Sequence, residues 1–190
     1  HAPKGVGALY LRSGVRIERF LHGGAQERTQ RAGTENMASI VGMGKAIELA
    51  TASLEENAAK LTALRDHMIA RLLDEIPYTR LNGHPHKRLP GNVNVCFRFI
   101  EGEALLLRLD FMGVAGSSGS ACTSGSLDPS HVLLAIGLPH EIAHGSLRLS
   151  LSQENTMEEV DYAVDALKQI VSQLRDLSPL YDEFLNKQEA

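Results

Sequence analysis

One thiol in this chain of 190 residues is a candidate nucleophile. Cys122 lies within the run 116–126 (GSSGSACTSGS), whose other residues are Gly, Ser, Ala and Thr. Such a run supplies almost nothing that can be buried, so we expect a mobile, exposed loop. Structural cysteines are normally buried, and a loop of this composition can carry a nucleophile to more than one place. The alternative is a bystander cysteine in a linker, because no His or Lys adjoins Cys122.

Cys96 is predicted to have a structural role instead. The segment 92–99 (NVNVCFRF) alternates polar and apolar residues, which is the period of a half-buried strand, and there packing is the simpler interpretation. Two cysteines without CxxC spacing indicate neither a disulfide scaffold nor a cysteine-rich zinc site. The histidines form no HExxH pattern, and His84 and His86 lie in a Gly/Pro-containing turn, so we expect no metal site.

Arg148 is a candidate for binding an anion. It lies in the segment 146–151 (SLRLSL), where three leucines alternate with two serines and the arginine. This alternation predicts a strand whose leucines face the core and whose other face carries Arg148. The planar guanidinium matches a carboxylate, which can belong to a ligand or to an acidic residue of this chain. The sequence leaves both possibilities open.

A second candidate anion site is the polar segment 22–34 (HGGAQERTQRAGT). It contains two arginines and ends on Thr34, directly before a predicted helix, where free backbone N–H groups favour a phosphate or carboxylate. The alternative is a surface turn with a helix cap, because the GxxxxGK spacing of a phosphate-binding P-loop is absent.

The elements that must position these residues follow from periodicity and from end signals. Strands are predicted at 6–11, 15–20, 92–99 and 146–151. Helices are predicted from the N-cap Thr34 to about residue 50, from a capping box at 53–56 to Pro77, over 102–110, from Asp128–Pro129 to Gly137, and from a capping box at 156–159 to about residue 174. Helices and mostly antiparallel strands occur together, so the predicted fold class is mixed α/β.

Composition excludes several classes of function. The formal charge is -4 and basic residues do not cluster, so we expect neither nucleic acid nor a membrane surface as a partner. No apolar run reaches the roughly 18 residues of a membrane helix, and the start has no signal-peptide pattern, so we expect a cytoplasmic protein. The chain begins with His1 and enters a strand-like run at once, which favours a fragment.

Four segments together resemble the C-terminal half of NifS-type cysteine desulfurases, which are fold-type-I pyridoxal-phosphate enzymes of the class-V aminotransferase family. They are HAPKGVGALYLR at 1–12, HGGAQERTQRAGTEN at 22–36, SSGSACTSGSLDPSHVLLAIGL at 117–138 and HGSLRLSLSQENTMEEVDY at 144–162. The resemblance implies a small α/β domain at 53–190. It also implies that residues 1–52 are the trailing strands and linking helix of the large cofactor-binding domain.

The resemblance also assigns roles to three residues. It implies that Cys122 attacks the sulfur of L-cysteine, carries it as a persulfide and passes it to an acceptor such as an iron–sulfur scaffold protein, with L-alanine released. Arg148 matches the arginine that binds the substrate carboxylate. Thr34 matches the threonine that reaches the phosphate of the partner subunit's pyridoxal phosphate in a homodimer. The long Ser/Gly loop resembles the branch that serves iron–sulfur cluster assembly.

One departure from the family concerns the cofactor. The lysine that forms the Schiff base lies upstream of the segment that matches this chain's start, and Lys4 corresponds to the family's PKG turn instead. We therefore expect these 190 residues alone to turn over L-cysteine negligibly. Two alternatives stay open: a non-enzymatic persulfide carrier or scaffold-docking module, and a related lyase acting on another amino acid such as selenocysteine.

Overall fold

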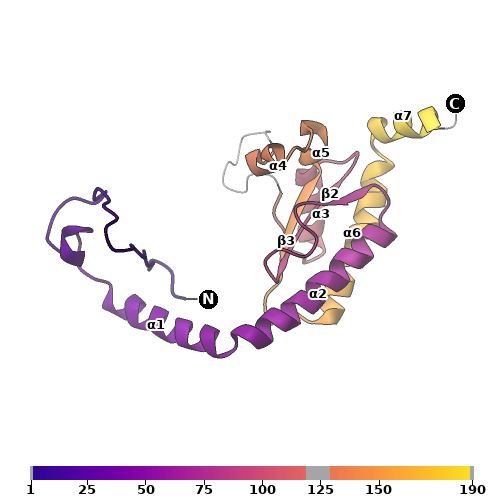
Figure 1. The fold of residues 1–190 in the computed structure, drawn as a ribbon. Helices are drawn as coiled ribbons and strands as arrows, with labels where there is room; N and C mark the ends of the chain where they lie inside the picture. Colours follow the sequence, from indigo (N-terminus) through magenta and orange to yellow (C-terminus); the bar gives the residue numbers. More distant parts are fainter. Residues whose placement is uncertain (1, 119–128, 189–190) are drawn as a thin grey trace. The chain divides into compact units, whose positions relative to one another are not determined.

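The computed structural model describes residues 2–118 and 129–188, and the chain forms two compact units, His1–Leu54 and Glu55–Ala190. Figure 1 traces the chain through the helices and strands of both units. The first unit contains the 3-10 turn η1 (Glu27–Thr29) and helix α1 (Met37–Ala52). The second unit contains every strand of the described residues and the remaining helices.

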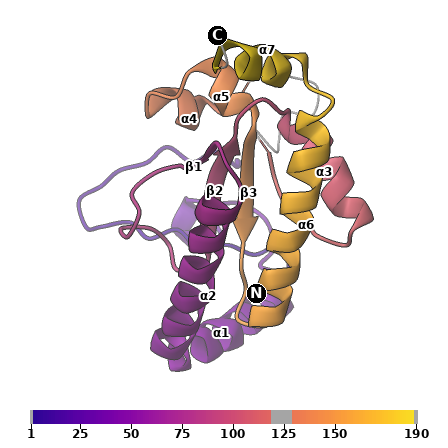
Figure 2. The same ribbon diagram turned by 90° about the vertical axis from the view of Figure 1, so that its right-hand side faces the viewer.

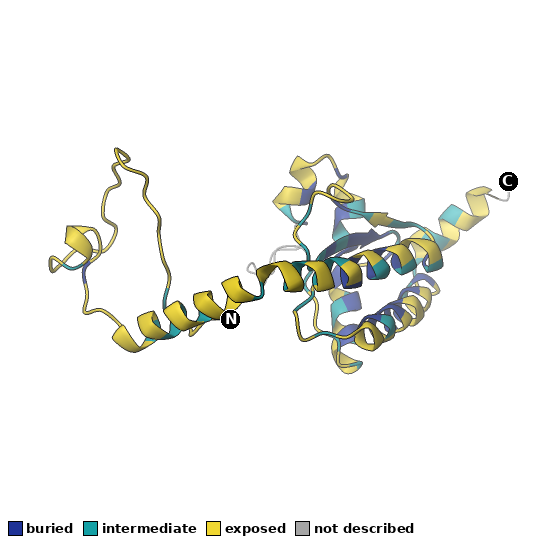
Figure 3. Cartoon of the chain, turned by 60° about the horizontal axis from the view of Figure 1, so that its bottom comes forward, coloured by how far each residue is buried: buried dark blue, intermediate teal, exposed yellow. Residues whose placement is uncertain are grey.

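The strands predicted at 6–11 and 15–20 are wrong. Both segments are irregular, and the backbone hydrogen bond found within 6–20 is that of a turn, from Val15 N to Arg12 O at 3.1 Å. Their apolar side chains are exposed, Tyr10 by 85% and Phe20 by 92%, as are most residues of this unit (Figure 3). The physical reason is that a strand needs a neighbour to pair its backbone groups, and the described residues supply none here.

Helix α1 begins two residues later than predicted. Its N-cap is Asn36, whose Oδ1 accepts a hydrogen bond from Ser39 N–H at 3.2 Å. Thr34 lies two residues before this cap, so the prediction that Thr34 caps the helix is wrong. Asn caps helices at least as well as Thr, and here it is the residue nearest the first turn.

The second unit is built on a three-stranded antiparallel sheet in the order β1-β2-β3, with β1 (Thr79–Leu81), β2 (Asn92–Phe97) and β3 (Ser146–Ser150). The antiparallel pairing and the alternation of β3 are confirmed. Strand β2 ends at Phe97 rather than at Phe99. The backbone of Phe99 has φ +72°, in the left-handed region, so the chain turns out of the sheet before that residue.

Three helices cover one face of this sheet (Figure 2): α2 (Leu54–Glu75), α3 (Gly102–Phe111) and α6 (Met157–Arg175). The buried core between them and the sheet includes Met68, Leu72, Val93, Val95, Phe97, Leu105, Leu109, Leu147, Val164 and Leu167. The predicted capping box at the start of α6 is confirmed. Thr156 Oγ1 accepts from Glu159 N–H at 3.2 Å, and Glu159 Oε2 accepts from Thr156 N–H at 3.2 Å.

Two predicted helix starts are wrong. Ser53 is the C-cap of α1 rather than a cap of α2, and in the described segments no bond joins it to Glu56. Only Ser53 separates the two helices, so no loop is present from which its side chain could cap the start of α2. Helix α4 (His131–Ala135) begins after Ser130, two residues beyond Pro129, while Asp128 lies outside the described residues. Gly137 ends the segment as predicted, with φ +89°.

Helices α4 and α5 (His140–His144) lie toward the opposite face of the sheet, where Leu133, Leu138 and Ala143 bury Cys96. Helix α7 (Pro179–Gln188) ends the described chain, and its Tyr181 and Phe184 rings pack against those of Tyr78 and Phe99. Neither α5, α7 nor β1 was predicted. No helix of residues 2–118 and 129–188 is both long and apolar enough to cross a membrane.

An ion-pair network joins α2 to α6. The Arg71 guanidinium contacts carboxylate oxygens of Glu75, Asp161 and Asp165 at 2.6, 2.9 and 2.7 Å. Asp161 also contacts His67 Nε2 at 2.6 Å, and Glu75 also contacts Lys168 Nζ at 3.1 Å. The network lies along the edge of the core, where the two helices run side by side.

Candidate functional site

The site develops on the sheet face that the core helices leave uncovered. Strand register places Asn94 of β2 opposite Arg148 of β3, and both side chains lie on that face because the neighbouring Val93, Val95, Leu147 and Leu149 point into the core. Asn82, just after β1, lies next to Asn94 on the neighbouring strand, since the backbone N–H of Asn82 donates to Asn94 O at 2.8 Å. The side chains of α4 and α5 cover Cys96 farther along the same face.

Arg148 is exposed on this face. One guanidinium nitrogen donates to Ser117 Oγ at 3.4 Å, and no carboxylate of the described residues pairs with it. The backbones of the two residues also pair, through Ser117 N to Arg148 O at 3.0 Å and Arg148 N to Ser117 O at 2.7 Å. The sequence left open whether Arg148 binds a carboxylate of this chain or that of a ligand. The described residues offer no carboxylate of this chain, so the guanidinium is available to a ligand.

A polar hollow of about 170 Å³ surrounds this guanidinium. Its lining residues are Asn94, Ser117, Ser130, Val132, Leu133, Ser146 and Arg148. Ser117 precedes and Ser130 follows the segment 119–128, so the chain on both sides of that segment borders the hollow. Cys122 belongs to the segment and lies outside the described residues.

Cys96 is fully buried, which confirms its predicted structural role. Burial raises the pKa of its thiol, and a hydrogen bond from Asn82 Nδ2 to Sγ at 3.1 Å opposes that increase in pKa. A buried thiol with a raised pKa is a poor nucleophile, because the thiolate is the reactive form. The chemistry of this face therefore does not come from Cys96.

Thr34 lies in the first unit and is exposed. It precedes the N-cap of α1, and within the described residues its hydroxyl makes no hydrogen bond. Nearby Arg31 uses its guanidinium to donate to the Ala32 carbonyl oxygen at 2.8 Å. An exposed hydroxyl without a partner among the described residues can donate one hydrogen bond to an anion.

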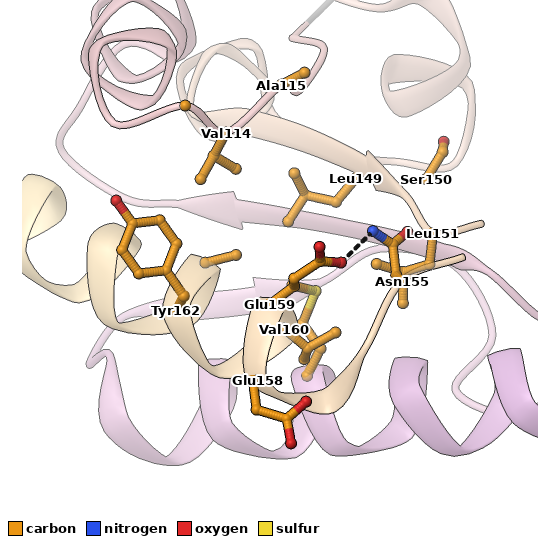
Figure 4. Close-up of a pocket in the computed structure, with 13 residues that line it drawn as sticks. Val114, Ala115, Leu149, Ser150, Leu151, Asn155, Glu158, Glu159, Val160 and Tyr162 are labelled. Carbon is orange, nitrogen blue, oxygen red and sulfur yellow. Dashed lines mark hydrogen bonds between the residues drawn. The ribbon is translucent and has the colours of Figure 1, made fainter. Parts of the chain in front are cut away.

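A larger hollow of about 540 Å³ lies on the other side of β3, by the start of α6 (Figure 4). Its lining is largely apolar, and the Glu159 carboxylate in it is already bonded to Asn155 Nδ2 at 2.9 Å and to the cap of α6. Arg148 does not line it. Because the polar groups of Asn155, Glu159 and Tyr162 in its lining are already paired, this hollow is a weaker candidate for chemistry than the one at Arg148. Among the described residues, no group of three or more His, Cys, Asp or Glu side chains could hold a metal ion.

Sequence reasoning missed three residues at this site: Asn82, Asn94 and Ser117. A signal existed for Asn94, since the alternation in 92–99 already placed it on the polar side of the strand. Its position opposite Arg148 depends on the register between β2 and β3, which the alternation alone does not fix.

Comparison with known proteins identifies what this architecture resembles. The family model for class-V aminotransferases matches residues 1–163. Cysteine desulfurase IscS of Methanosarcina thermophila is 61% identical over 178 residues, which are 94% of this chain and 44% of that protein. Cysteine desulfurase NifS of Azotobacter vinelandii is 51% identical over 181 residues, 95% of this chain and 45% of that protein. The chain therefore spans about half the length of the curated relatives it matches.

Solved structures give the same result. A NifS-like protein has a TM-score of 0.79 at 37% identity, covering 92% of this chain and 44% of the other. The NifS-like protein from Rickettsia africae has a TM-score of 0.74 at 30% identity, covering 83% of this chain and 41% of the other. These likenesses confirm the predicted α/β fold and its resemblance to NifS-like proteins.

Proposed function

This chain belongs to the class-V aminotransferase family, and we propose that it forms part of a cysteine desulfurase that converts L-cysteine to L-alanine. The observation that carries the proposal is the polar hollow around Arg148, bordered by the chain on both sides of the segment that contains Cys122. An anion-binding guanidinium that acts together with the Cys122 thiol would suit a substrate that has both a carboxylate and a sulfur atom. The high identity to named cysteine desulfurases supports the same reaction.

In this proposal Cys122 is the nucleophile. Its sulfur attacks the substrate sulfur, so that an S–S bond forms on Cys122, the C–S bond of the substrate breaks, and the carbon skeleton leaves as L-alanine after taking up protons. Cys122 is five positions after Ser117 at the rim of the hollow, so at most about 18 Å of extended chain lies between them. That length is sufficient for the thiol to approach a ligand on Arg148.

Arg148 binds the substrate carboxylate in this proposal. The backbone of Arg148 is fixed by its pairing with Ser117. Its guanidinium is exposed to the hollow, and most of the guanidinium N–H donors have no partner among the described residues. A planar carboxylate accepts two parallel hydrogen bonds from such a fork, which fixes the orientation of the amino acid as well as its position.

The cofactor of this reaction is pyridoxal phosphate, which supplies an electron sink for bond changes in an amino acid. We assign to this chain one contact with it, from the Thr34 hydroxyl to the phosphate of the partner subunit's cofactor in a homodimer. Lys4 lies in an exposed turn and takes no part. In this proposal another part of the complete protein supplies the lysine that forms the Schiff base, and this chain spans 44% of the length of the Methanosarcina relative. The sulfur then passes from Cys122 to an acceptor such as an iron–sulfur scaffold protein.

The domain assignment follows the same reasoning. Residues 1–52 belong to the large cofactor-binding domain, and residues 53–190 form the small domain that carries Cys122 and Arg148. The exposed apolar side chains of the first unit, such as Tyr10 and Phe20, are consistent with a segment that packs against a sheet outside this chain.

The experiment that tests the function is sulfide release from L-cysteine with added pyridoxal phosphate. The 190-residue chain alone is expected to release negligible sulfide, and the complete protein that contains it is expected to be active. Cys122→Ala in the complete protein should abolish release. Activity that survives this substitution would contradict the proposed nucleophile, and persulfide acceptance without cofactor would favour a sulfur carrier instead. Higher activity with selenocysteine in the complete protein would favour a lyase for that amino acid.

A further inference from the structure

We propose that Asn94 is a second substrate-binding residue, whose side-chain amide donates a hydrogen bond to the same carboxylate that Arg148 binds. This inference rests on the proposed function, because it takes the ligand of the hollow to be an α-amino acid. It deepens that function by assigning a second, uncharged hydrogen-bond donor beside Arg148 for the substrate carboxylate. It also identifies the residue that positions this donor.

The position of Asn94 follows from the sheet. Asn94 and Arg148 are register partners on adjacent antiparallel strands, so their Cβ atoms lie about 4.5–5.5 Å apart on one face. Both side chains line the same hollow. A carboxylate held by the guanidinium of Arg148 would therefore lie within reach of the Asn94 side chain.

Asn82 fixes which end of the Asn94 amide faces the hollow. Asn82 Nδ2 donates to Asn94 Oδ1 at 2.7 Å, so the oxygen of Asn94 is occupied from the β1 side. Within the described residues, the Asn94 NH₂ group makes no hydrogen bond, which leaves two donors available. Donors rather than acceptors are what an anion needs.

The burial of Asn82 favours this orientation over the reversed one. Asn82 is only 5% exposed, and its own Oδ1 has no partner in the part of the chain that the structure describes. Turning both amides around would satisfy that oxygen but would leave the buried Asn82 NH₂ group without an acceptor. Buried N–H donors without partners are rarer and costlier than carbonyl oxygens in that state. Asn82 is thus a positioning residue, which acts by holding the Asn94 amide with its donors toward the hollow.

The test compares two ligands in the cofactor-loaded complete protein by calorimetry. L-Alanine carries the carboxylate, and ethylamine is the same molecule without it. Asn94→Ala removes the donor. Asn94→Asp keeps an acceptor for Asn82, and therefore the local fold, but replaces the donor by a negative charge. Asn92→Asp is the matched control, because Asn92 lies two residues away on the same face of β2 and does not line the hollow.

Asn94→Ala is expected to raise the Kd for L-alanine roughly tenfold, the loss typical of one hydrogen bond to a charged group, and to leave the Kd for ethylamine unchanged. Asn94→Asp should weaken L-alanine further, while Asn92→Asp changes either Kd less than about threefold. An equal change for both ligands, or no change for L-alanine, would overturn the proposal. If the wild-type protein binds L-alanine but releases no sulfide from L-cysteine, the desulfurase function is wrong and the Kd comparison still decides the role of Asn94.

Discussion

Ser117 and Arg148 exchange two backbone hydrogen bonds, of 3.0 and 2.7 Å, and the Arg148 guanidinium also reaches Ser117 Oγ at 3.4 Å. Ser117 is thereby attached to the edge of β3 through a β-bridge, two residues before the segment 119–128. This pairing fixes Ser117 next to the guanidinium. Ser117 and Arg148 therefore form one structural unit.

Breaking this backbone pair should impair sulfur transfer more than removing the serine side chain. Ser117→Pro eliminates the N–H that donates to Arg148 O, whereas Ser117→Ala keeps both backbone bonds. In the complete protein we expect Ser117→Pro to reduce kcat for sulfide release about 10- to 100-fold, because a small displacement of a reacting group is costly. Ser117→Ala should lose less. Equal rates for the two variants would show that the pair has no such role.

Arg148→Gln should reduce kcat/KM for L-cysteine roughly 100-fold, because it removes a charged, two-pronged contact with the carboxylate. Arg148→Lys keeps the charge but loses the planar fork, so its loss should be intermediate. Because Arg148 is exposed, neither variant should lower the melting temperature by more than about 2 °C. Arg80→Gln is the control: Arg80 is exposed on β1 opposite Cys96 and away from the hollow. A similar loss of activity in that control would point to a general charge effect.

Cys96 should resist alkylation in the folded protein. It is fully buried, and burial raises the pKa of its thiol, so little thiolate forms and no reagent reaches it. In a Cys122→Ser variant, Cys96 is the only remaining thiol of the chain. Iodoacetamide at pH 8 should label it at least about 100-fold more slowly than after unfolding in urea, measured by intact mass. Labelling at the same rate in both states would contradict the packing of Cys96 against α4 and α5.

Parts of the fold could be predicted from the sequence because the spacing of their apolar residues follows directly from burying one face against a single core. Helix α6 shows both a capping box and a helical period of apolar residues. Strand β3 alternates polar and apolar residues along its whole length, with Leu147 and Leu149 as the apolar ones. In such segments the local propensity and the tertiary environment agree, so a pattern in one stretch of chain suffices.

Other parts depend on partners that a local pattern cannot reveal. The segments 6–11 and 15–20 have strand composition, yet no neighbouring strand among the described residues pairs them. Strand β1 and helix α5 are too short to show a period. At the site, Arg148 was identifiable because it is the charged residue on the polar side of the alternating segment 146–151. Asn94 was not, because its relation to Arg148 is a matter of strand register.

The pH dependence of stability should be set largely by the network between α2 and α6. Hydrogen bonds from Arg71 and Lys168 lower the pKa of Glu75 from 4.5 to about 2, and bonds from His67 and then Arg71 lower the pKa of Asp161. Both carboxyls bind protons more tightly in the unfolded chain than in the folded one. Their contribution to the stability of the folded state is therefore fully present above about pH 4.5 and is lost as the pH falls toward 2.

Removing Arg71 tests this directly. Arg71→Met should lower the melting temperature at pH 7 by about 3–5 °C and flatten its decrease between pH 5 and pH 3, since the carboxyl pKa values return toward normal. The matched control is Lys45→Met, which removes the exposed Lys45–Glu48 pair of α1 and should leave the profile unchanged. Calorimetric melts of the three proteins across this range measure both effects. A profile for Arg71→Met as steep as that of the wild type would mean that other carboxyls control acid unfolding, and that the contacts of Arg71 with Glu75, Asp161 and Asp165 contribute little to joining the two helices.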